Sequence, residues 1–302
     1  MSGFYDGLVD LVGKDNISRD ELLGAYTTFK IGGPADYLAR PTTYTQIAEV
    51  IKLAEEHSVP YFILGNGSNV LVSDKGYRGL IIHISQNLSH IETDGNRIRA
   101  GAGALLIKTA YEAKKHSLTG MEFASGIPGT VGGAVYMNAG AYGGEMKNII
   151  SSVKVLDRDY NIKDIPVCDM DFSYRHSIIE EQGMIVLEAE FELKQGDVQQ
   201  IEQEMKRLAE SRQSKQPLSL PSAGSTFKRP EGNFAGKLIM DAGLKGAAVG
   251  DAMVSQKHCG FVVNNGKATA EDVRRLIKHI QDTVYDRFGV HLETEVKMLG
   301  DF

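Results

Sequence analysis

Cysteine is scarce in this 302-residue chain, which has only Cys168 and Cys259, and tryptophan is absent. Two cysteines so far apart form no disulfide framework and lack the spacing of a zinc site. The N-terminus has acidic residues but no basic segment followed by an apolar run, so it does not resemble a signal peptide. Apolar runs such as Leu80–Ile82 are far too short to cross a bilayer. We therefore expect a protein of the reducing cytoplasm that does not enter the membrane.

An excess of positive charge is also missing, since the formal net charge is −6. A general nucleic-acid binder needs a clustered basic face to meet the phosphate backbone, so we exclude that class. A small anionic ligand is still allowed, because it needs only a few local cations. Hydrophobic residues make up 42% and charged residues 24% of the chain, as in ordinary globular proteins. The length allows about two domains, and the sequence has no internal repeat and no sign of an obligate protein partner.

Short strands and helices alternate along the first third of the chain, which is an α+β pattern. A capping box at Thr43–Gln46 precedes apolar residues at helical spacing. The strands that we expect are Tyr61–Leu64, Val70–Val72, Gly79–Ser85, Ile98–Ala100, Ser152–Leu156, Ile185–Leu193 and Gly260–Asn264. The helices that we expect are one after Thr43, Ala104–His116, one from Val198 that ends before Lys215, and one opened by Thr269.

The segment Gly65-Asn-Gly-Ser-Asn69 follows directly on an expected strand. Glycines let the backbone turn tightly and bring its N–H groups against a ligand oxygen, as a diphosphate requires, while Ser68 and Asn69 add donors. A plain hairpin turn is the alternative that the pentapeptide leaves open. Val70 stands where the G-x-G-x-x-G fingerprint needs its third glycine, and Gly101-Ala-Gly103 fails in the same way. Because no Walker A sequence is present either, Rossmann and P-loop nucleotide sites are disfavoured.

A second glycine-rich stretch, residues 120–144, breaks every periodicity. It is too long for a turn and too apolar for a disordered linker, so we expect one ordered loop of special conformation. Its segment Ser125–Ala134 combines hydroxyls, a proline and glycines. Such a loop lays backbone donors along a diphosphate while Ile127 and Val131 shield it. Close packing of the loop under a sheet is the alternative.

These features resemble the FAD-binding half of flavoproteins of the vanillyl-alcohol-oxidase type. More narrowly, they resemble the UDP-N-acetylenolpyruvoylglucosamine reductase family, also called UDP-N-acetylmuramate dehydrogenases. The resemblance extends from about Thr28 to Gly300, and the motifs are far more specific together, in this order, than singly. They are Thr28–Asp36, Gly65–Asn69, Ser125–Ala134, Phe172–Ser177, Ala223–Pro230, Val254–Asn264 and Leu292–Val296.

The resemblance implies an α+β fold in which an FAD-binding half, made of two α+β subdomains, is joined to a smaller C-terminal α+β substrate domain. We place the subdomains at residues 1–84 and 85–212 and the substrate domain at residues 213–289, because Lys215–Pro221 has the composition of a boundary. Residues 290–302 are a candidate to pack back on the first subdomain. The short path from Arg175 to Ser225 implies the shorter subclass, which lacks an inserted tyrosine loop.

The resemblance also implies a reaction, the NADPH-dependent reduction of UDP-N-acetylglucosamine enolpyruvate to UDP-N-acetylmuramate with FAD as cofactor. This reaction serves peptidoglycan synthesis, and through it cell-wall biogenesis, cell shape, the cell cycle and cell division. Hydride from the reduced flavin N5 attacks the terminal enolpyruvyl carbon, and negative charge develops on the neighbouring carbon and its carboxylate. The enzyme has to stabilise that enolate and deliver one proton. No residue of the chain by itself indicates NADPH rather than NADH.

By this resemblance the chemistry belongs to Arg175, Ser225 and Glu295. A guanidinium binds a carboxylate through two parallel hydrogen bonds and stays charged, which suits Arg175 to the substrate carboxylate. The Ser225 hydroxyl is the proton donor to the carbanion. Glu295, with its pKa raised by burial, would hydrogen-bond the enolate as a neutral acid. From the residues alone, Arg175 also fits a surface arginine and Ser225 a turn serine, and spacing does not separate Glu295 from Glu293.

Binding residues follow from the same resemblance. Lys215 matches a position that contacts the diphosphate of the substrate, although lysines at a helix end are commonly just solvated. Further substrate candidates are Tyr174, Arg212 and Lys228. The cofactor-binding residues that we expect are Gly65, Asn66, Gly67, Ser68, Asn69, Ser125, Gly126, Ile127, Pro128, Gly129, Thr130, Gly132, Gly133 and Ala134.

Two departures from the family pattern are Thr294, where a proline is usual, and Arg229, where some relatives have a substrate-contacting asparagine. Two other functions stay open. One is an alcohol or sugar oxidase of the same flavin fold, although neither glycine-rich loop has the His or Cys that often tethers the flavin. The other is a nucleotide-sugar-binding regulator without chemistry. We expect no metal site, because His258 and Cys259 would point to opposite faces of a strand.

Overall fold

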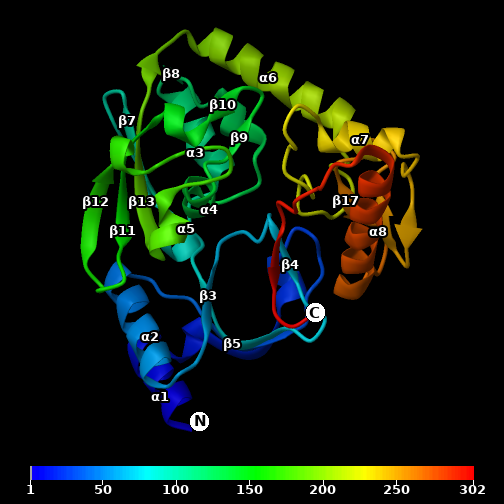
Figure 1. The fold of residues 1–302 in the computed structure, drawn as a ribbon. Coiled ribbons are helices and arrows are strands. Elements are labelled where there is room, and N and C mark those ends of the chain that lie inside the picture. The colour runs from blue at the N-terminus through cyan, green and yellow to red at the C-terminus, as the bar shows by residue number, and fades with distance from the viewer. Residues whose placement is uncertain (1) are drawn as a thin grey trace. The chain divides into compact units, whose positions relative to one another are not determined.

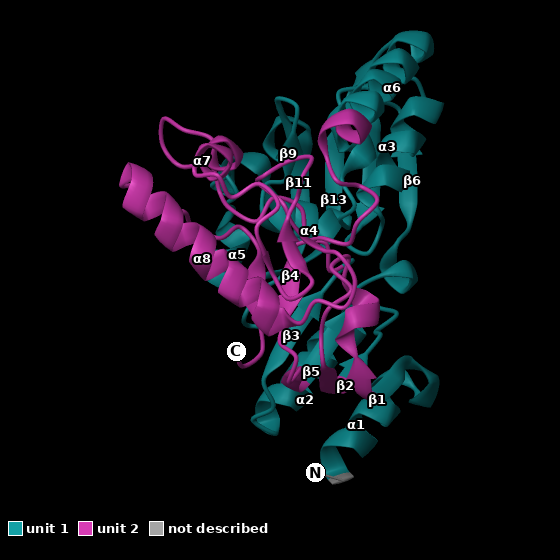
Figure 2. Ribbon diagram, turned by 90° about the vertical axis from the view of Figure 1, so that its right-hand side faces the viewer, with its two compact units in different colours: residues 1–18, 38–66, 80–211 teal, residues 19–37, 67–79, 212–302 magenta. Residues whose placement is uncertain are grey.

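The computed structural model describes residues 2–302. Contacts divide the chain into two compact units (Figure 2). Unit 1 contains residues 1–18, 38–66 and 80–211, and unit 2 contains residues 19–37, 67–79 and 212–302. Each unit is therefore assembled from segments that are far apart in the sequence. The division after residues 84, 212 and 289 that we expect from the sequence stays a prediction.

Two helices of unit 1, α1 (Ser2–Val12) and α2 (Tyr44–Glu56), pack against each other. α2 begins where the sequence predicts, because the Thr43 hydroxyl accepts a 3.1 Å hydrogen bond from the Gln46 N–H. The Gln46 side chain accepts from the N–H of Thr42, at 2.7 Å, so the reciprocal half of the expected capping box falls one residue earlier. α2 buries Ile47, Ala48, Val50, Ile51 and Ala54.

A four-stranded sheet has the order β1-β2-β5-β3. Its strands are β1 (Ile17–Leu22), β2 (Pro34–Ala39), β5 (Tyr77–His83) and β3 (Tyr61–Leu64). β3 and β5 run parallel, with Tyr61 opposite Leu80 and Leu64 opposite His83. The bounds of β3 agree with the sequence prediction, and β5 begins slightly earlier than expected.

Unit 1 also contains a five-stranded antiparallel sheet of order β12-β11-β13-β7-β6 (Figure 1). Its strands are β12 (Ile162–Pro166), β11 (Ile150–Leu156), β13 (Ile185–Glu192), β7 (Arg97–Gly101) and β6 (Ile91–Asp94). α3 (Leu106–Lys115) and α4 (Val131–Tyr136) pack against this sheet.

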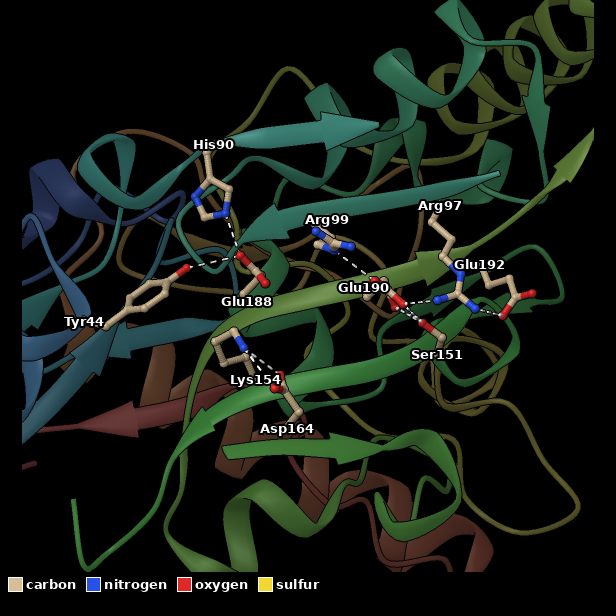
Figure 3. Close-up of polar contacts among 10 residues, drawn as sticks. All are labelled: Tyr44, His90, Arg97, Arg99, Ser151, Lys154, Asp164, Glu188, Glu190 and Glu192. Carbon is tan, nitrogen blue, oxygen red and sulfur yellow. Dashed lines mark hydrogen bonds and ion pairs between the residues drawn. The ribbon is translucent and has the colours of Figure 1, made fainter. Parts of the chain in front are cut away.

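The alternation along β13 separates a buried from a charged side of the sheet. Leu187, Ala189 and Phe191 are each 0% exposed. The glutamates between them pair with Arg97 and Arg99 of the neighbouring strand β7 and with His90, which directly precedes β6 (Figure 3). Such partly exposed pairs contribute about 0–1 kcal/mol each, so burial of the apolar side stabilises the sheet more. The pairs of β13 are His90–Glu188, Arg97–Glu190, Arg99–Glu190 and Arg97–Glu192, and Lys154–Asp164 joins β11 to β12 on the same sheet.

The prediction of a single loop over residues 120–144 is wrong, because the stretch contains short helices and strands. They are η4 (Glu122–Gly126), α4, β9 (Gly140–Ala141) and β10 (Gly144–Glu145), which pairs with β9. Glycines are poor helix formers, which hides α4 in the sequence. A Cβ at Gly132 would lie 3.0 Å from the Cβ of Ala102, so glycine permits α4 to pack closely here.

The remaining elements of the first 215 residues are short apart from one helix. α6 ends at Lys215 rather than before it, which corrects the sequence prediction. The elements are β8 (Leu118–Thr119), which pairs with β14 (Lys194–Gln195), α5 (Ile178–Gln182) and α6 (Val198–Lys215). Isolated 3-10 turns are Lys14–Asn16, Leu23–Tyr26, Gln86–Leu88, Met146–Asn148 and Val167–Asp169.

Unit 2 is built around α8 (Ala270–Phe288), which packs against a sheet of order β15-β16-β17 and against α7 (Ala235–Asp241). The strands are β15 (Ala248–Val249), β16 (Ala252–Val254) and β17 (Val262–Asn264). β17 begins later than predicted, because the Phe261 N–H bonds to the carbonyl of His258 in a turn. His258 and Cys259 therefore lie in a turn and not on a strand. α8 buries Val273, Leu276, Ile277, Ile280 and Val284.

The start of α8 agrees with the sequence prediction and is reinforced from elsewhere in unit 2. Thr269 and Asp272 form a complete capping box. The Asp74 carboxylate accepts hydrogen bonds from the N–H groups of Ala270, at 2.8 Å, and Glu271, at 3.0 Å. Asp74 follows β4 (Val70–Val72), which pairs in parallel with β18 (Lys297–Leu299).

Among residues 2–302, no helix is long and apolar enough to cross a membrane. Both cysteines are free thiols, with Cys168 exposed and Cys259 buried. Burial raises the pKa of the Cys259 thiol.

Candidate functional site

The two glycine-rich loops meet within unit 1. The Asn66 side-chain amide donates a 2.5 Å hydrogen bond to the carbonyl of Pro128. A Cβ at Gly65 would lie 2.4 Å from Thr130 Oγ1, so only glycine permits this approach. The segments at 65–66 and 128–130 therefore lie in contact with each other.

Backbone donors are available at the second loop. Among the residues that the structure describes, the N–H groups of Gly129 and Thr130 have no acceptor. Thr130 is buried, and a buried N–H without a partner costs about 1–3 kcal/mol, so a ligand oxygen there would be stabilising. Gly133 is exposed, and a Cβ at this position would meet only Thr130 Oγ1, at 3.7 Å. N–H groups of this kind are available to the oxygen of an anionic ligand.

The end of the first loop, residues 67–69, belongs to unit 2. Gly67 has a φ of 58°, and a Cβ there would lie 2.1 Å from the carbonyl oxygen of Tyr26. Glycine is therefore needed at Gly67 both for its backbone conformation and for close packing. Ser68 lies next to it in the same turn.

Thr28 forms hydrogen bonds both with this loop and with the segment that contains Ser225. Its N–H donates a 3.2 Å hydrogen bond to the carbonyl of Gly67, and its hydroxyl donates a 2.7 Å bond to the carbonyl of Ser222. The sequence places Thr28 at the start of a family motif but gives it no role. A hydroxyl residue ahead of the buried Phe29 was the signal that could have identified it.

Ser225 and Glu295 lie on neighbouring segments of unit 2. An isolated bridge pairs Phe227 with Thr294. Beside it, the Glu295 N–H donates to the carbonyl of Thr226 at 2.9 Å. Ser225 itself is exposed, and the next residue, Thr226, is fixed by the Val262 N–H, which donates to its hydroxyl at 3.0 Å. The structure thus brings together the segments of the expected proton donor and the expected acid.

Glu293 and Glu295 differ in their surroundings. The Glu293 carboxylate pairs with Lys228 Nζ at 3.2 Å, and its side chain is 74% exposed. Glu295 is half-buried, and its carbonyl accepts a hydrogen bond from the Asn69 side chain. Glu295 is therefore the less exposed of the two acids. The ion pair with Glu293 occupies the Lys228 ammonium, so Lys228 is a weaker candidate for a contact with the substrate.

Arg175 lies in unit 1 at the tip of a tight turn. The backbones of Ser173 and His176 are bonded to each other, with N–H to carbonyl distances of 3.2 and 3.3 Å. Arg175 has a φ of 57°, a region that costs a non-glycine residue about 1–2 kcal/mol. Its guanidinium carbon lies 4.9 Å from the ring centre of Tyr174, and Nη2 donates a 3.4 Å bond to the carbonyl of Gly140.

The other expected substrate residues are less informative. Arg212 and Lys215 lie in the last turn of α6, where Arg212 is half-buried and Lys215 is exposed. Tyr174 is 46% exposed. Arg229 is one of the two departures from the family pattern. Its guanidinium lies over the ring of Phe234, 4.9 Å from the ring centre.

His83 is a residue near the site that the sequence analysis missed. It ends β5, opposite Leu64, which directly precedes Gly65. Burial, helped by the charge of Arg40 and opposed by a backbone hydrogen bond with Gly65, lowers the pKa of His83 to about 4. His83 is therefore neutral at pH 7, beside the first loop.

A second feature that spacing did not reveal is a group of Asp171, His176 and Glu181, which could offer three ligand atoms to a metal ion. His176 Nε2 lies 3.5 Å from Asp171 Oδ2 and 3.7 Å from Glu181 Oε1. The two carboxylates are 73% and 64% exposed. Exposed acidic groups of this kind are common in proteins without a bound metal ion.

Comparison with known families gives two matches. Residues 216–299 match the family described as UDP-N-acetylenolpyruvoylglucosamine reductase, C-terminal domain. Residues 35–165 match the FAD binding domain family. The first match contains Ser225 and Glu295, and the second contains both glycine-rich loops.

Curated relatives called UDP-N-acetylenolpyruvoylglucosamine reductase are similar to this chain over nearly their whole length. The Agathobacter rectalis protein is 51% identical, with 99% of each chain covered. The Clostridioides difficile protein is 50% identical, with 98% of each chain covered. The Streptococcus uberis protein is 52% identical, with 97% of this chain and 96% of the relative covered.

Solved structures agree with these relatives. The UDP-N-acetylenolpyruvylglucosamine reductase from Thermus caldophilus is 36% identical, with a TM-score of 0.82 over 94% of this chain and 98% of that chain. Phl p 4.0202, a glucose dehydrogenase, is 16% identical, with a TM-score of 0.51 over 65% of this chain and 44% of that chain, which shows a likeness of fold alone. The predicted fold, an FAD-binding half with a C-terminal domain, is confirmed.

Proposed function

Because the chain belongs to the UDP-N-acetylenolpyruvoylglucosamine reductase family, we propose that it reduces UDP-N-acetylglucosamine enolpyruvate to UDP-N-acetylmuramate. The enolpyruvyl double bond gains a hydride at its terminal carbon and a proton at the neighbouring carbon, and NADPH is oxidised to NADP⁺. At the level of residues, one observation supports this proposal. The segments that contain Ser225 and Glu295 pair with each other at the end of the first glycine-rich loop.

FAD, reduced by NADPH, supplies the hydride from its N5 atom. The residues that hold FAD in this proposal are those of the two glycine-rich loops. The unpaired N–H groups of Gly129 and Thr130 are suited to donate to diphosphate oxygens. The open space beside Gly133 gives the cofactor room against the backbone.

Arg175 binds the substrate carboxylate in this proposal. Its two parallel donors match two carboxylate oxygens, and its charge stabilises the enolate as negative charge spreads into the carboxylate. The left-handed backbone at Arg175 supports the assignment, because strain of this kind persists where function outweighs stability. Tyr174, which packs on the guanidinium, is proposed as a neighbouring substrate contact.

Ser225 donates the proton, and Glu295 hydrogen-bonds the enolate as a neutral acid. Exposure of Ser225 supports its role, since a proton donor has to reach the substrate carbon. Partial burial of Glu295 supports the second role, since a hydrogen bond to a ligand is stronger where less water surrounds it. Arg212 and Lys215 are proposed to contact the substrate diphosphate, with Lys228 as a weaker candidate.

We extend the proposal to peptidoglycan synthesis, which uses UDP-N-acetylmuramate, and through it to cell shape and cell division. A reducing, cytoplasmic location is consistent with the two free cysteines. Depletion of the protein should cause the enolpyruvyl substrate to accumulate in cell extracts. A normal level of this substrate after depletion would contradict the cellular role.

The reaction is tested by following the flavin band near its visible maximum in an anaerobic cuvette. NADPH should bleach the band, and UDP-N-acetylglucosamine enolpyruvate should then restore it. If only oxygen restores the colour, the protein is an oxidase of the same fold. If the purified protein is colourless and does not take up FAD, it is a binding protein without flavin chemistry.

Substitutions test the residue roles in the same assay. Ser225→Ala should still bleach with NADPH but lose turnover with the enolpyruvyl substrate. Glu295→Gln should slow the return of colour, whereas the matched control Glu293→Gln, at an exposed and ion-paired position, should not. Equal effects of the two glutamate substitutions would remove Glu295 from the mechanism.

A further inference from the structure

The turn that displays Arg175 does not fix its own conformation. Its two backbone bonds, between Ser173 and His176, are long at 3.2 and 3.3 Å. The left-handed φ of 57° at Arg175 is unfavourable for any residue with a side chain. Contacts from outside the turn are therefore needed to hold it.

Asn138 provides one such contact. It lies just after α4 and is 0% exposed. Its Nδ2 donates a 2.9 Å hydrogen bond to the carbonyl of Ser173, at the start of the turn. A buried amide that binds the backbone of another segment fixes that segment, because breaking the bond would leave a buried polar group unpaired.

The orientation of the Asn138 amide is itself fixed. Oδ1 accepts a 3.0 Å bond from the Lys147 N–H, and Nδ2 also donates a 3.2 Å bond to Glu145 Oε2. Lys147 Nζ lies 3.0 Å from the same carboxylate oxygen. The hydrogen bond from Lys147 has the largest effect on the pKa of the Glu145 carboxyl. With the hydrogen bond from Asn138 and the positive charge of Arg175, it holds this pKa below its usual range against the effect of burial. The amide therefore has one donor side and one acceptor side that cannot be exchanged.

The other end of the turn is anchored to the same helix. Ser177 is 0% exposed, and its hydroxyl donates a 2.6 Å bond to the carbonyl of Tyr136, the last residue of α4. Gly140, two residues after Asn138, accepts the 3.4 Å bond from the Arg175 guanidinium. Backbone and side chain of Arg175 are thus both held by the segment that follows α4. The other end of α4 begins at Thr130, in the second glycine-rich loop.

We propose that Asn138 is a positioning residue for Arg175, with Ser177 as the second anchor of the turn. This inference rests on the role proposed above for Arg175 at the substrate carboxylate. Its physical basis is that a carboxylate-binding guanidinium acts through geometry, and a misplacement of about 1 Å lowers a rate by roughly 100-fold. Neither anchor touches the substrate, so both act through Arg175.

Two substitutions separate the donor function of Asn138 from its volume. Asn138→Gly keeps the positive φ of 44° accessible and removes all three side-chain bonds. Asn138→Asp keeps the shape and the acceptor but loses both donors and places a second carboxylate beside Glu145. We expect both variants to retain FAD and to bleach with NADPH within about twofold of wild type. Return of colour with the enolpyruvyl substrate should be at least roughly tenfold slower.

The matched control is Thr109→Val. Thr109 is also 0% exposed, and its hydroxyl donates to the carbonyl of Leu105 at 3.2 Å, a hydrogen bond that does not involve the Arg175 turn. We expect both half-reactions to be unchanged in this variant. A general loss of packing would slow both half-reactions in the Asn138 variants, or slow the Thr109 variant as well, and would overturn the proposal.

Combination with Arg175→Lys tests whether Asn138 acts through Arg175. The double variant Asn138→Gly, Arg175→Lys should be no slower than Arg175→Lys alone. Losses that multiply would show that Asn138 acts independently, which overturns the inference. Wild-type return of colour in Arg175→Lys would instead refute the role of Arg175 itself. If Asn138→Gly purifies without FAD, Ser177→Ala is used in its place in the same assay. If the flavin colour returns at the wild-type rate in both Ser177→Ala and Asn138→Asp, the inference is overturned.

Discussion

The side-chain amide of Asn69 donates a 3.1 Å hydrogen bond to the backbone carbonyl of Glu295, although the two residues are 226 positions apart. The Lys297 N–H in turn donates to the carbonyl of Asn69 at 3.0 Å. These bonds continue into the parallel pairing of β4 and β18. The proposed acid is therefore placed beside the end of the first glycine-rich loop by a strand pair and not by a flexible tail.

Gly133→Ala tests whether FAD lies against the first turn of α4. The protein itself has room for the methyl group, since its nearest neighbour would be Thr130 Oγ1 at 3.7 Å. Alanine favours a helix over glycine by about 1 kcal/mol, so the variant should fold at least as stably as wild type. We nevertheless expect weaker FAD binding, measured as flavin absorbance per protein after gel filtration. Full FAD content would place the cofactor elsewhere.

Gly65→Ala should lose FAD for a different reason. Its methyl group would lie 2.4 Å from Thr130 Oγ1 and push the two loops apart. The variant should therefore have a lower melting temperature even without FAD, unlike Gly133→Ala. Equal melting temperatures of the two cofactor-free variants would contradict the packing that we describe at Gly65.

Arg175→Gly and Arg175→Ala should be equally inactive but not equally stable. Both lose the guanidinium, and only glycine adopts the φ of 57° without strain. We expect the free energy of unfolding of the glycine variant to be higher by about 1 kcal/mol, measured by urea denaturation. A more stable alanine variant would show that the turn does not require the left-handed conformation.

Asp74→Ala should destabilise unit 2 by about 1–2 kcal/mol, because it removes the acceptor for two N–H groups at the start of α8. The matched control is Asp282→Ala on the same helix. Asp282 pairs with Lys278 in an exposed position, and such pairs contribute little. Thermal unfolding of the two variants should differ clearly, and similar melting temperatures would refute the capping role of Asp74.

Stability should fall as the pH is lowered from 6.5 toward 4, in part through His83. The unfolded histidine takes up a proton near pH 6.5, whereas burial lowers the pKa of the folded residue to about 4. Between these values the unfolded state binds more protons, so the free energy of unfolding rises with pH. His83→Asn should show a shallower slope of unfolding free energy against pH between 4.5 and 6.5. An unchanged slope would indicate that His83 is solvated.

Local patterns predicted much of the fold. Tyr61–Leu64 and Val70–Val72 are strands with the predicted bounds, and Thr43 and Thr269 begin helices as predicted. These signals are carried by neighbouring residues, so no distant contact is needed to recognise them. α4 was missed for the opposite reason. Its glycines disfavour a helix locally, and the close approach of Gly132 to Ala102 makes them necessary.

The features of the candidate site also fall into those that the sequence indicated and those that only the structure identified. The glycine-rich loops indicated a diphosphate site without any coordinates, and the resemblance of the Arg175, Ser225 and Glu295 motifs to a known family indicated a flavin-dependent reductase. The structure supplied what spacing leaves open, namely that Glu293 is exposed and paired with Lys228 while Glu295 is half-buried. It also identified Asn138, whose role depends on a hydrogen bond to the carbonyl of Ser173.

The sequence by itself thus determined the family, the cofactor and the residue types of the chemistry. Only the tertiary structure decided which of two equivalent acids is half-buried, and which buried amide bonds to the arginine turn. The reason is physical: residue type fixes what a side chain can donate, accept or ionise. Burial and partners from distant segments fix whether it does so, and no local pattern encodes them.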